Sequence, residues 1–214
     1  KLVKEGKADI PMKGILQTSN FARAILNRET GLIPESGRRL VSQCGVFEYE
    51  GRFVMITDAA ININPDVETQ IGIVENALPV AKALGIDCPK VAVLSAVENV
   101  TEKMASTVSA AEIAKRGVPG CIISGPLALD GAISMESVKH KSIKDPVAGQ
   151  ADILLVPFIE IGNVLYKACT YIAGKTMAST ICGASCPVVI TSRADTPDSK
   201  YYSILMAVLR CIKG

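Results

Sequence analysis

The sequence has a single histidine, no apolar stretch long enough to cross a membrane, and no run of basic residues. A membrane helix needs about 18 or more consecutive apolar residues, so a membrane-spanning protein is not expected. The net charge of +2 comes from 23 basic and 21 acidic residues mixed along the chain, unlike the clustered charge of nucleic-acid-binding proteins. We therefore expect a cytoplasmic protein that binds neither nucleic acid nor membranes.

Several catalytic and metal-binding motifs are also missing. The single histidine, His140, lies among lysines, which argues against a Ser-His-Asp triad and a multi-histidine metal site. The seven cysteines include no Cys-x-x-Cys pair, and the closest two, Cys182 and Cys186, lie among small apolar residues. This pattern is typical of reduced, buried thiols. There is no Gly-x-Gly-x-x-Gly motif and no P-loop, and we expect no bound metal.

Strand and helix patterns alternate along most of the 214 residues. Strand candidates at 91–97, 121–124 and 153–156 follow or precede helices in which apolar residues recur at helical spacing. One such helix begins at Asn64-Pro65, with Asn64 as its N-cap. Two extended runs between 45 and 61 are joined by Glu50-Gly51 and predict a hairpin. The fold class is therefore α/β, with mostly parallel sheets and an antiparallel hairpin element.

The segment 191–198, Thr-Ser-Arg-Ala-Asp-Thr-Pro-Asp, lies between a short apolar strand and an amphipathic helix. Ligands of α/β proteins collect at strand ends, where helix N-termini attract anions. The segment alone makes Ser192, Arg193, Asp195 and Asp198 equal candidates for an anion site. The alternative is an ordinary turn, with Arg193 paired to Asp195 at the surface and Asp198 as a helix-start carboxylate.

Four further segments stand after strand or helix patterns: TDAAIN at 57–62, GPLALDGA at 125–132, DPVAGQAD at 145–152, and VPFIEIGN at 156–163 with Tyr166-Lys167 behind it. Together with 191–198 they resemble the phosphate acetyl/butyryl transferase family. The resemblance runs from about residue 12 to the C-terminus, in the family's order and without large gaps. GPLALDGAIS, residues 151–167 and TSRADTPDSK favour the butyryl branch.

This resemblance implies a fold similar to that of isocitrate and isopropylmalate dehydrogenases, with two α/β domains and the active site in the cleft between them. Residues 31–174 are expected to form one domain, and residues 1–30 and 175–214 the other. Family members extend further at the N-terminus, so the discontinuous domain is expected to lack its N-terminal part. A homodimer or a higher homo-oligomer is also implied.

The implied reaction is reversible: acyl-CoA and phosphate give acyl phosphate and CoA, by direct transfer in a ternary complex. CoA is then a substrate, and no tightly bound cofactor is needed. Asp198 matches the family's catalytic aspartate, which would take the proton of the CoA thiol. Arg193 matches the arginine that contacts the acyl phosphate, and Ser192 matches a serine beside it, a donor to the carbonyl oxygen.

The resemblance also places substrate-binding residues at strand ends. Thr18, Ser19 and Arg23 follow the first expected strand at the start of a helix, a place for phosphate or the CoA pyrophosphate. Gly125, Asn163 and Lys167 are expected to face the cleft. The alternatives are a tight turn for Gly125 and solvated helix faces for Arg23 and Lys167.

Three other functions stay open. The chain could be a phosphate acetyltransferase, or a truncated, inactive fragment that only binds CoA or oligomerises. A decarboxylating dehydrogenase would need a cluster of aspartates for a divalent metal, and the chain has only scattered ones, such as Asp130 and Asp152.

Overall fold

The computed structural model describes residues 1–34, 38–192 and 194–213. Its strands are β1 (Ser42–Tyr49), β2 (Arg52–Thr57), β3 (Lys90–Leu94), β4 (Ile122–Leu127), β5 (Ile153–Leu155), β6 (Ala178–Cys182) and β7 (Val188–Val189). Its helices are α1 (Thr18–Ile25), α2 (Val67–Ala83), α3 (Ala105–Arg116), α4 (Leu129–Ile133), α5 (Met135–Lys141), α6 (Ile159–Tyr171) and α7 (Pro197–Lys213). Within these described ranges, no helix is both long enough and apolar enough to cross a membrane.

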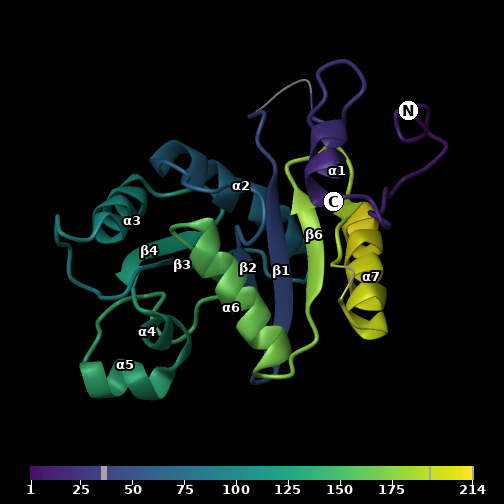
Figure 1. The fold of residues 1–214 in the computed structure, drawn as a ribbon. Helices are drawn as coiled ribbons and strands as arrows, with labels where there is room; N and C mark the ends of the chain where they lie inside the picture. Colours follow the sequence, from purple (N-terminus) through teal and green to yellow (C-terminus); the bar gives the residue numbers. More distant parts are fainter. Residues whose placement is uncertain (35–37, 193, 214) are drawn as a thin grey trace.

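The strands form one sheet in the order β4-β3-β5-β2-β1-β6-β7 (Figure 1). Pairing is parallel from β4 to β2 and antiparallel from β2 to β7. The α/β class and the hairpin at Glu50-Gly51 are confirmed. Antiparallel pairing extends beyond the hairpin, to β6 and β7. The connection 183–187 between β6 and β7 is too short for a parallel crossover.

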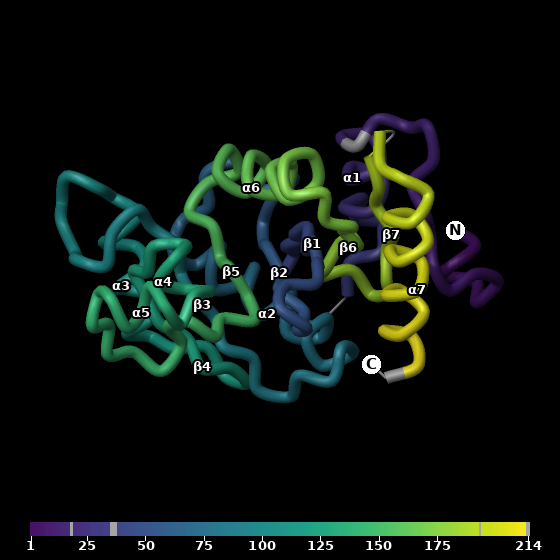
Figure 2. The backbone as a smooth tube through the Cα atoms, turned by 90° about the horizontal axis from the view of Figure 1, so that it is seen from below, coloured from purple at the N-terminus to yellow at the C-terminus, as the bar shows by residue number. Residues whose placement is uncertain are grey.

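Helices cover both faces of the sheet, with α6 on one face and α2 on the other (Figures 1 and 2). Side chains alternate between the two faces of a strand, so Met55 of β2 packs in the core under α2, α3 and α7, and Val54 and Ile56 pack under α6 and α4. A third cluster joins Ile25 of α1 to Val188 and Ile190 at the β7 edge. Both faces therefore exclude water, and α6 is held against the sheet.

Helix α2 begins two residues later than the sequence pattern predicts. Asp66, and not Asn64, is the N-cap, because its carboxylate accepts a hydrogen bond from the backbone N of Thr69 at 2.8 Å. This carboxylate satisfies one of the N–H groups that a helix leaves unpaired at its start. Hydrogen bonds from the side chain and the backbone N of Thr69 lower the pKa of Asp66 below its ordinary value of 3.8.

Replacing Asp66 by alanine is expected to lower the midpoint of thermal unfolding by roughly 2–4 °C at neutral pH, since a cap is lost. The folded-state pKa is depressed, so the stabilisation is present above pH 3.8 and is lost as the pH falls through the folded-state value. The difference between the two proteins should therefore shrink in acid. Thermal melts at pH 7 and pH 3 check this, and an equal difference at both values would contradict it.

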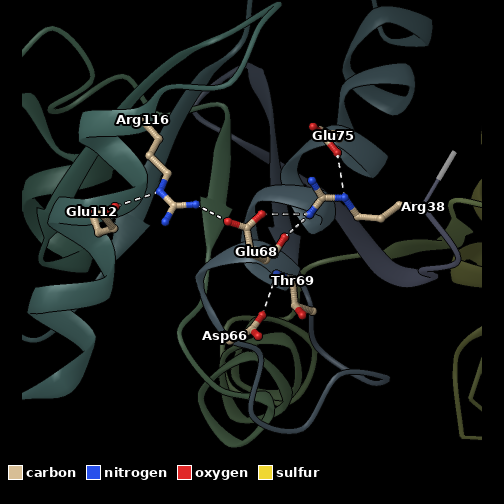
Figure 3. Close-up of polar contacts among 7 residues, drawn as sticks. All are labelled: Arg38, Asp66, Glu68, Thr69, Glu75, Glu112 and Arg116. Atoms are coloured by element: carbon tan, nitrogen blue, oxygen red, sulfur yellow. Dashed lines mark hydrogen bonds and ion pairs between the residues drawn. The ribbon is translucent and has the colours of Figure 1, made fainter.

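An ion-pair network surrounds the N-terminal turns of α2 (Figure 3). Glu68 contacts both Arg38, which precedes β1, and Arg116 at the end of α3. Arg38 also pairs with Glu75 at 3.6 Å, and Arg116 with Glu112 at 2.8 Å. All of these side chains are substantially exposed, and exposed pairs stabilise little. The network links three elements but lies on the opposite face of the sheet from α6.

Candidate functional site

A cavity of about 280 Å³ opens beside α6, between this helix and the segment 190–195. We call it the α6 cavity. Helix α6 contributes Asn163, Tyr166 and Lys167, and the turn after β2 contributes Ala59 and Ala60. Gln43 of β1 and Ser179 of β6 also line it, as do Ser192 and Asp195 from the segment that precedes α7. Side chains from distant parts of the sequence thus meet at one place.

Two glycines allow α6 to lie this close to the sheet. A Cβ on Gly162 would be 2.5 Å from the carbonyl oxygen of Asp58, and one on Gly45 would be 2.6 Å from the Tyr166 ring. Contacts of this length do not occur, so neither position tolerates a side chain without a shift of α6. Asn163 fastens the first turn of α6 by donating to the carbonyl oxygen of Ala59 at 3.2 Å.

The turn after β2 is built around the buried carboxylate of Asp58. Its Oδ1 accepts from the backbone N of Gln43, Ala60 and Ile61, and its Oδ2 accepts from the backbone N and the Nδ2 of Asn62, at distances from 2.6 to 3.2 Å. Burial raises the pKa of Asp58, and these hydrogen bonds act against that rise. The carboxylate fixes the backbone that forms one wall of the cavity.

Tyr166 lines the α6 cavity and has a raised pKa. Burial is the main cause, and the negative charge of Asp195 adds to it. The phenol therefore stays protonated near neutral pH. It can serve as a hydrogen-bonding group in the site but not as a base.

The segment 191–198 forms the predicted turn between a strand and a helix. The backbone N of Ser192 donates to Oδ2 of Asp195 at 2.6 Å, which closes the turn. Thr196 caps α7, because its Oγ1 accepts from the backbone N of Ser199 at 3.1 Å. Asp195 therefore holds the turn in shape, while the Ser192 side chain is exposed beside the cavity.

Three of the predicted site residues, Ser192, Asn163 and Lys167, come together at the α6 cavity. Arg193 lies outside the described residues. Asp198 is exposed in the first turn of α7, and its carboxylate has no hydrogen bond or ion pair with any residue that the structure describes. It does not line the α6 cavity.

Thr18, Ser19 and Arg23 stand in α1, as predicted, with Thr18 as its first residue. Ser19 and Arg23 are exposed, and neither lines the α6 cavity. The strand expected before α1 is wrong: over the described residues this segment makes one isolated bridge, Met12 with Val189. Pro11 has no N–H to donate, which limits pairing there.

Gly125 lies inside β4, away from the α6 cavity. A Cβ at this position would be 2.7 Å from the carbonyl oxygen of Val93 in β3. The glycine is therefore explained by the close approach of two strands. The structure gives it no place in the α6 cavity.

The sequence patterns missed two residues that form the floor of the cavity, Gln43 and Ser179. Both lie within strands and are buried, at 4% exposure each. A polar residue in an alternating strand gives no sign that it faces a ligand, so no local pattern could have found them. Asp58 was within reach, because it lies in the segment 57–62 that the sequence singles out.

A larger groove of about 630 Å³ lies on the other flank of α6. It is lined mainly by apolar side chains, among them Met104, Leu129, Ile161 and Val164. Ile161 and Val164 are 45% and 68% exposed. One flank of α6 thus faces a polar cavity and the other an open apolar surface.

These features define an α/β protein with a polar cavity beside a strand-to-helix turn. The model of the family described as phosphate acetyl/butaryl transferase matches residues 1–208. The chain is 47% identical over 215 residues to the phosphate butyryltransferase of Clostridium beijerinckii, covering 98% of this chain and 70% of that protein. It is 40% identical to the phosphate acetyltransferase of Thermotoga maritima, covering 97% of this chain and 71% of that protein.

Solved structures agree with the sequence comparisons. A branched-chain phosphotransacylase from Enterococcus faecalis V583 superposes with a TM-score of 0.91 at 40% identity, covering 100% of this chain and 77% of that one. A 4-hydroxythreonine-4-phosphate dehydrogenase from Klebsiella pneumoniae, at 13% identity, shares the fold with a TM-score of 0.54 and covers 98% and 66%. This chain belongs to the phosphate acetyl/butyryl transferase family, a family of acyltransferases, and the predicted resemblance is confirmed.

Proposed function

We propose that this chain transfers a short acyl group, butyryl in preference to acetyl, reversibly between CoA and inorganic phosphate. The observation that carries the proposal is the α6 cavity, which gathers Ser192, Asn163 and Lys167 beside the turn 191–198. An exposed ammonium group at Lys167 is suited to attract the phosphates of both substrates. Family membership supplies the reaction class.

In the direction of acyl-CoA formation, the CoA sulfur attacks the acyl carbon of acyl phosphate, and phosphate leaves with the electron pair of the carbon–oxygen bond. We assign the thiol proton to the carboxylate of Asp198, in the first turn of α7. Arg193 neutralises the leaving phosphate, and the Ser192 hydroxyl donates to the carbonyl oxygen as it gains negative charge. No acyl-enzyme and no tightly bound cofactor takes part.

We further propose that the site lies between two domains, one formed by residues 31–174 and the other by residues 1–30 and 175–214. The origin of the cavity lining supports this division, since Asn163 and Lys167 come from the first unit and Ser192 and Asp195 from the second. Thr18, Ser19 and Arg23 of α1 then belong to the same unit as Asp198, and we assign them to the outer part of the CoA or phosphate site.

The proposal is tested by arsenate-dependent release of CoA from butyryl-CoA, because an acyl arsenate hydrolyses at once and makes the reaction irreversible. The parent chain should release CoA, and Arg193→Gln should lower the turnover number by about 10²–10³-fold, since one preorganised donor to the developing charge is lost. A higher kcat/KM for acetyl-CoA than for butyryl-CoA would assign the chain to the acetyl branch. No release by the parent would leave the inactive-fragment alternative.

We also propose that the chain forms a homodimer or a higher homo-oligomer in the cytoplasm, where CoA and phosphate are available. The exposed apolar side chains of α6 support association, because a large apolar surface is seldom left in water. Light scattering with an in-line column measures the mass directly. A monomer at every concentration tested would contradict this part of the proposal.

A further inference from the structure

Gln43 has a buried oxygen that no described residue satisfies. Its side chain is 4% exposed, and it lines the α6 cavity. Its Nε2 donates to Oγ of Ser179 at 2.6 Å, while its Oε1 has no hydrogen-bond partner among the described residues. A buried carbonyl oxygen without a donor is unfavourable, and here the oxygen belongs to a residue that lines the α6 cavity.

The surrounding structure holds Gln43 firmly in this position. Its backbone N donates to Asp58 at 3.2 Å, and its carbonyl oxygen accepts from Oγ1 of Thr57 at 3.0 Å. The Ser179 that receives its side chain is itself tied to α7, since the backbone N of Ser179 donates to Oγ of Ser203 at 2.9 Å. The amide is therefore set in place from β2, β6 and α7, and it is positioned before any ligand arrives.

Gln70 provides a comparison for Gln43, because its side-chain oxygen is also unpaired but the residue does not line the α6 cavity. Gln70 is 2% exposed, donates through Nε2 to the carbonyl oxygen of Pro65 at 3.0 Å, and also leaves its Oε1 unpaired. It lies on α2, on the opposite face of the sheet, and does not line the α6 cavity. The two glutamines match in type, burial and bonding and differ in access to the site.

We propose that Oε1 of Gln43 accepts a hydrogen bond from an amide N–H of the pantetheine arm of CoA, which makes Gln43 a further substrate-binding residue. The inference rests on the proposed function. Phosphate and acyl phosphate present mainly acceptor oxygens, which a carbonyl oxygen does not attract. The pantetheine arm is a flexible chain that carries two amide N–H groups, and Gln43 lines the cavity of about 280 Å³.

Equilibrium binding of CoA, measured by calorimetry, tests the inference with a matched pair of variants. Gln43→Met keeps the length of the side chain and removes the amide, and it should weaken CoA binding by about 5- to 10-fold, as expected for one hydrogen bond. Gln70→Met is the control and should leave CoA binding within about twofold of the parent. The KM for phosphate should stay within about twofold in both variants.

A substrate analogue keeps the test valid if Gln43→Met does not fold. A CoA analogue in which an ester oxygen replaces the amide N–H should bind the parent about 5- to 10-fold more weakly than CoA, for at least one of the two amides. Equal binding of CoA by Gln43→Met and the parent overturns the inference, as does equal binding of CoA and of both ester analogues. A shift in the phosphate KM alone also overturns it.

The outcomes separate this inference from the proposed function. A parent that binds CoA but releases none from butyryl-CoA, together with weakened CoA binding by Gln43→Met, would refute the catalytic proposal and support the contact. A parent that turns over butyryl-CoA, with unchanged CoA binding by Gln43→Met, would support the catalytic proposal and refute the contact. A parent that does not bind CoA refutes both.

Discussion

Replacing Asp198 by asparagine is expected to lower the turnover number for arsenate-dependent CoA release by about 10²–10⁴-fold, the range for loss of a general base. Asparagine has nearly the same shape but cannot take the thiol proton. The binding of acyl-CoA should change little, because asparagine keeps the size and polarity of the side chain and the lost group acts only in proton transfer. Initial rates at saturating butyryl-CoA and arsenate give the turnover number directly.

Asp130→Asn is the matched control for this experiment. Asp130 is also an exposed carboxylate in the first turn of a helix, α4, and it contacts Lys141 at 3.0 Å, away from the α6 cavity. Its replacement should leave the turnover number within about twofold, so a loss confined to Asp198→Asn cannot be due to the removal of any helix-start charge. Full activity in Asp198→Asn would assign the base to another group.

The helices were the most predictable part of the fold, because each carries its own signals. Apolar residues at helical spacing predict α2, and Gly85, with a φ of 86°, follows its last turn. Gly117, with a φ of 70°, ends α3 in the same way. Glycine adopts this left-handed conformation without steric cost, which is why it marks helix ends so reliably. The first residue of α2 was displaced, because Asp66 caps the helix in place of Asn64.

The edge of the sheet could not be predicted in the same way. The short apolar strand predicted before residue 191 is β7, but its partner β6 lies in a segment that sequence patterns leave unassigned. The N-terminal segment joins the edge through the single bridge at Met12. This bridge and the pairing of β1 with β6 join residues that are far apart in the sequence, so they leave no periodic pattern in any one segment.

The residues of the candidate site also divide into those that the sequence predicted and those that it did not. Ser192, Asn163 and Lys167 were predicted from the resemblance to the family, which implies that they face the substrates, and the structure gathers all three. Gln43 was not predicted, because its importance arises from a cavity and an unpaired oxygen that exist only in the folded chain. Gly125 marked a close contact between strands, which a sequence cannot distinguish from a turn that faces a ligand.

The largest effect on stability is expected at Asp58. Replacing it by asparagine should lower the free energy of unfolding by about 3 kcal/mol. This is in the range found when a buried, hydrogen-bonded charge is removed and its partners are left unpaired. All five of its hydrogen bonds come from N–H donors, at Gln43, Ala60, Ile61 and Asn62. An asparagine would turn a new NH₂ group toward some of these donors and leave them unpaired in the interior. Urea unfolding at pH 7, followed by circular dichroism, measures the change.

Asp152→Asn provides the comparison for this prediction. Asp152 is a partly buried carboxylate whose Oδ2 accepts one backbone hydrogen bond, from Lys90 at 2.8 Å, and whose Oδ1 lies 3.9 Å from Arg52. An asparagine oxygen can replace that single acceptor, so the loss should be about 1 kcal/mol or less. Equal losses in the two variants would show that the number of donors around Asp58 does not matter. A large loss of stability in Asp58→Asn alone would mean that this one carboxylate keeps Ala59, Ala60 and Gln43, which line the cavity, in place.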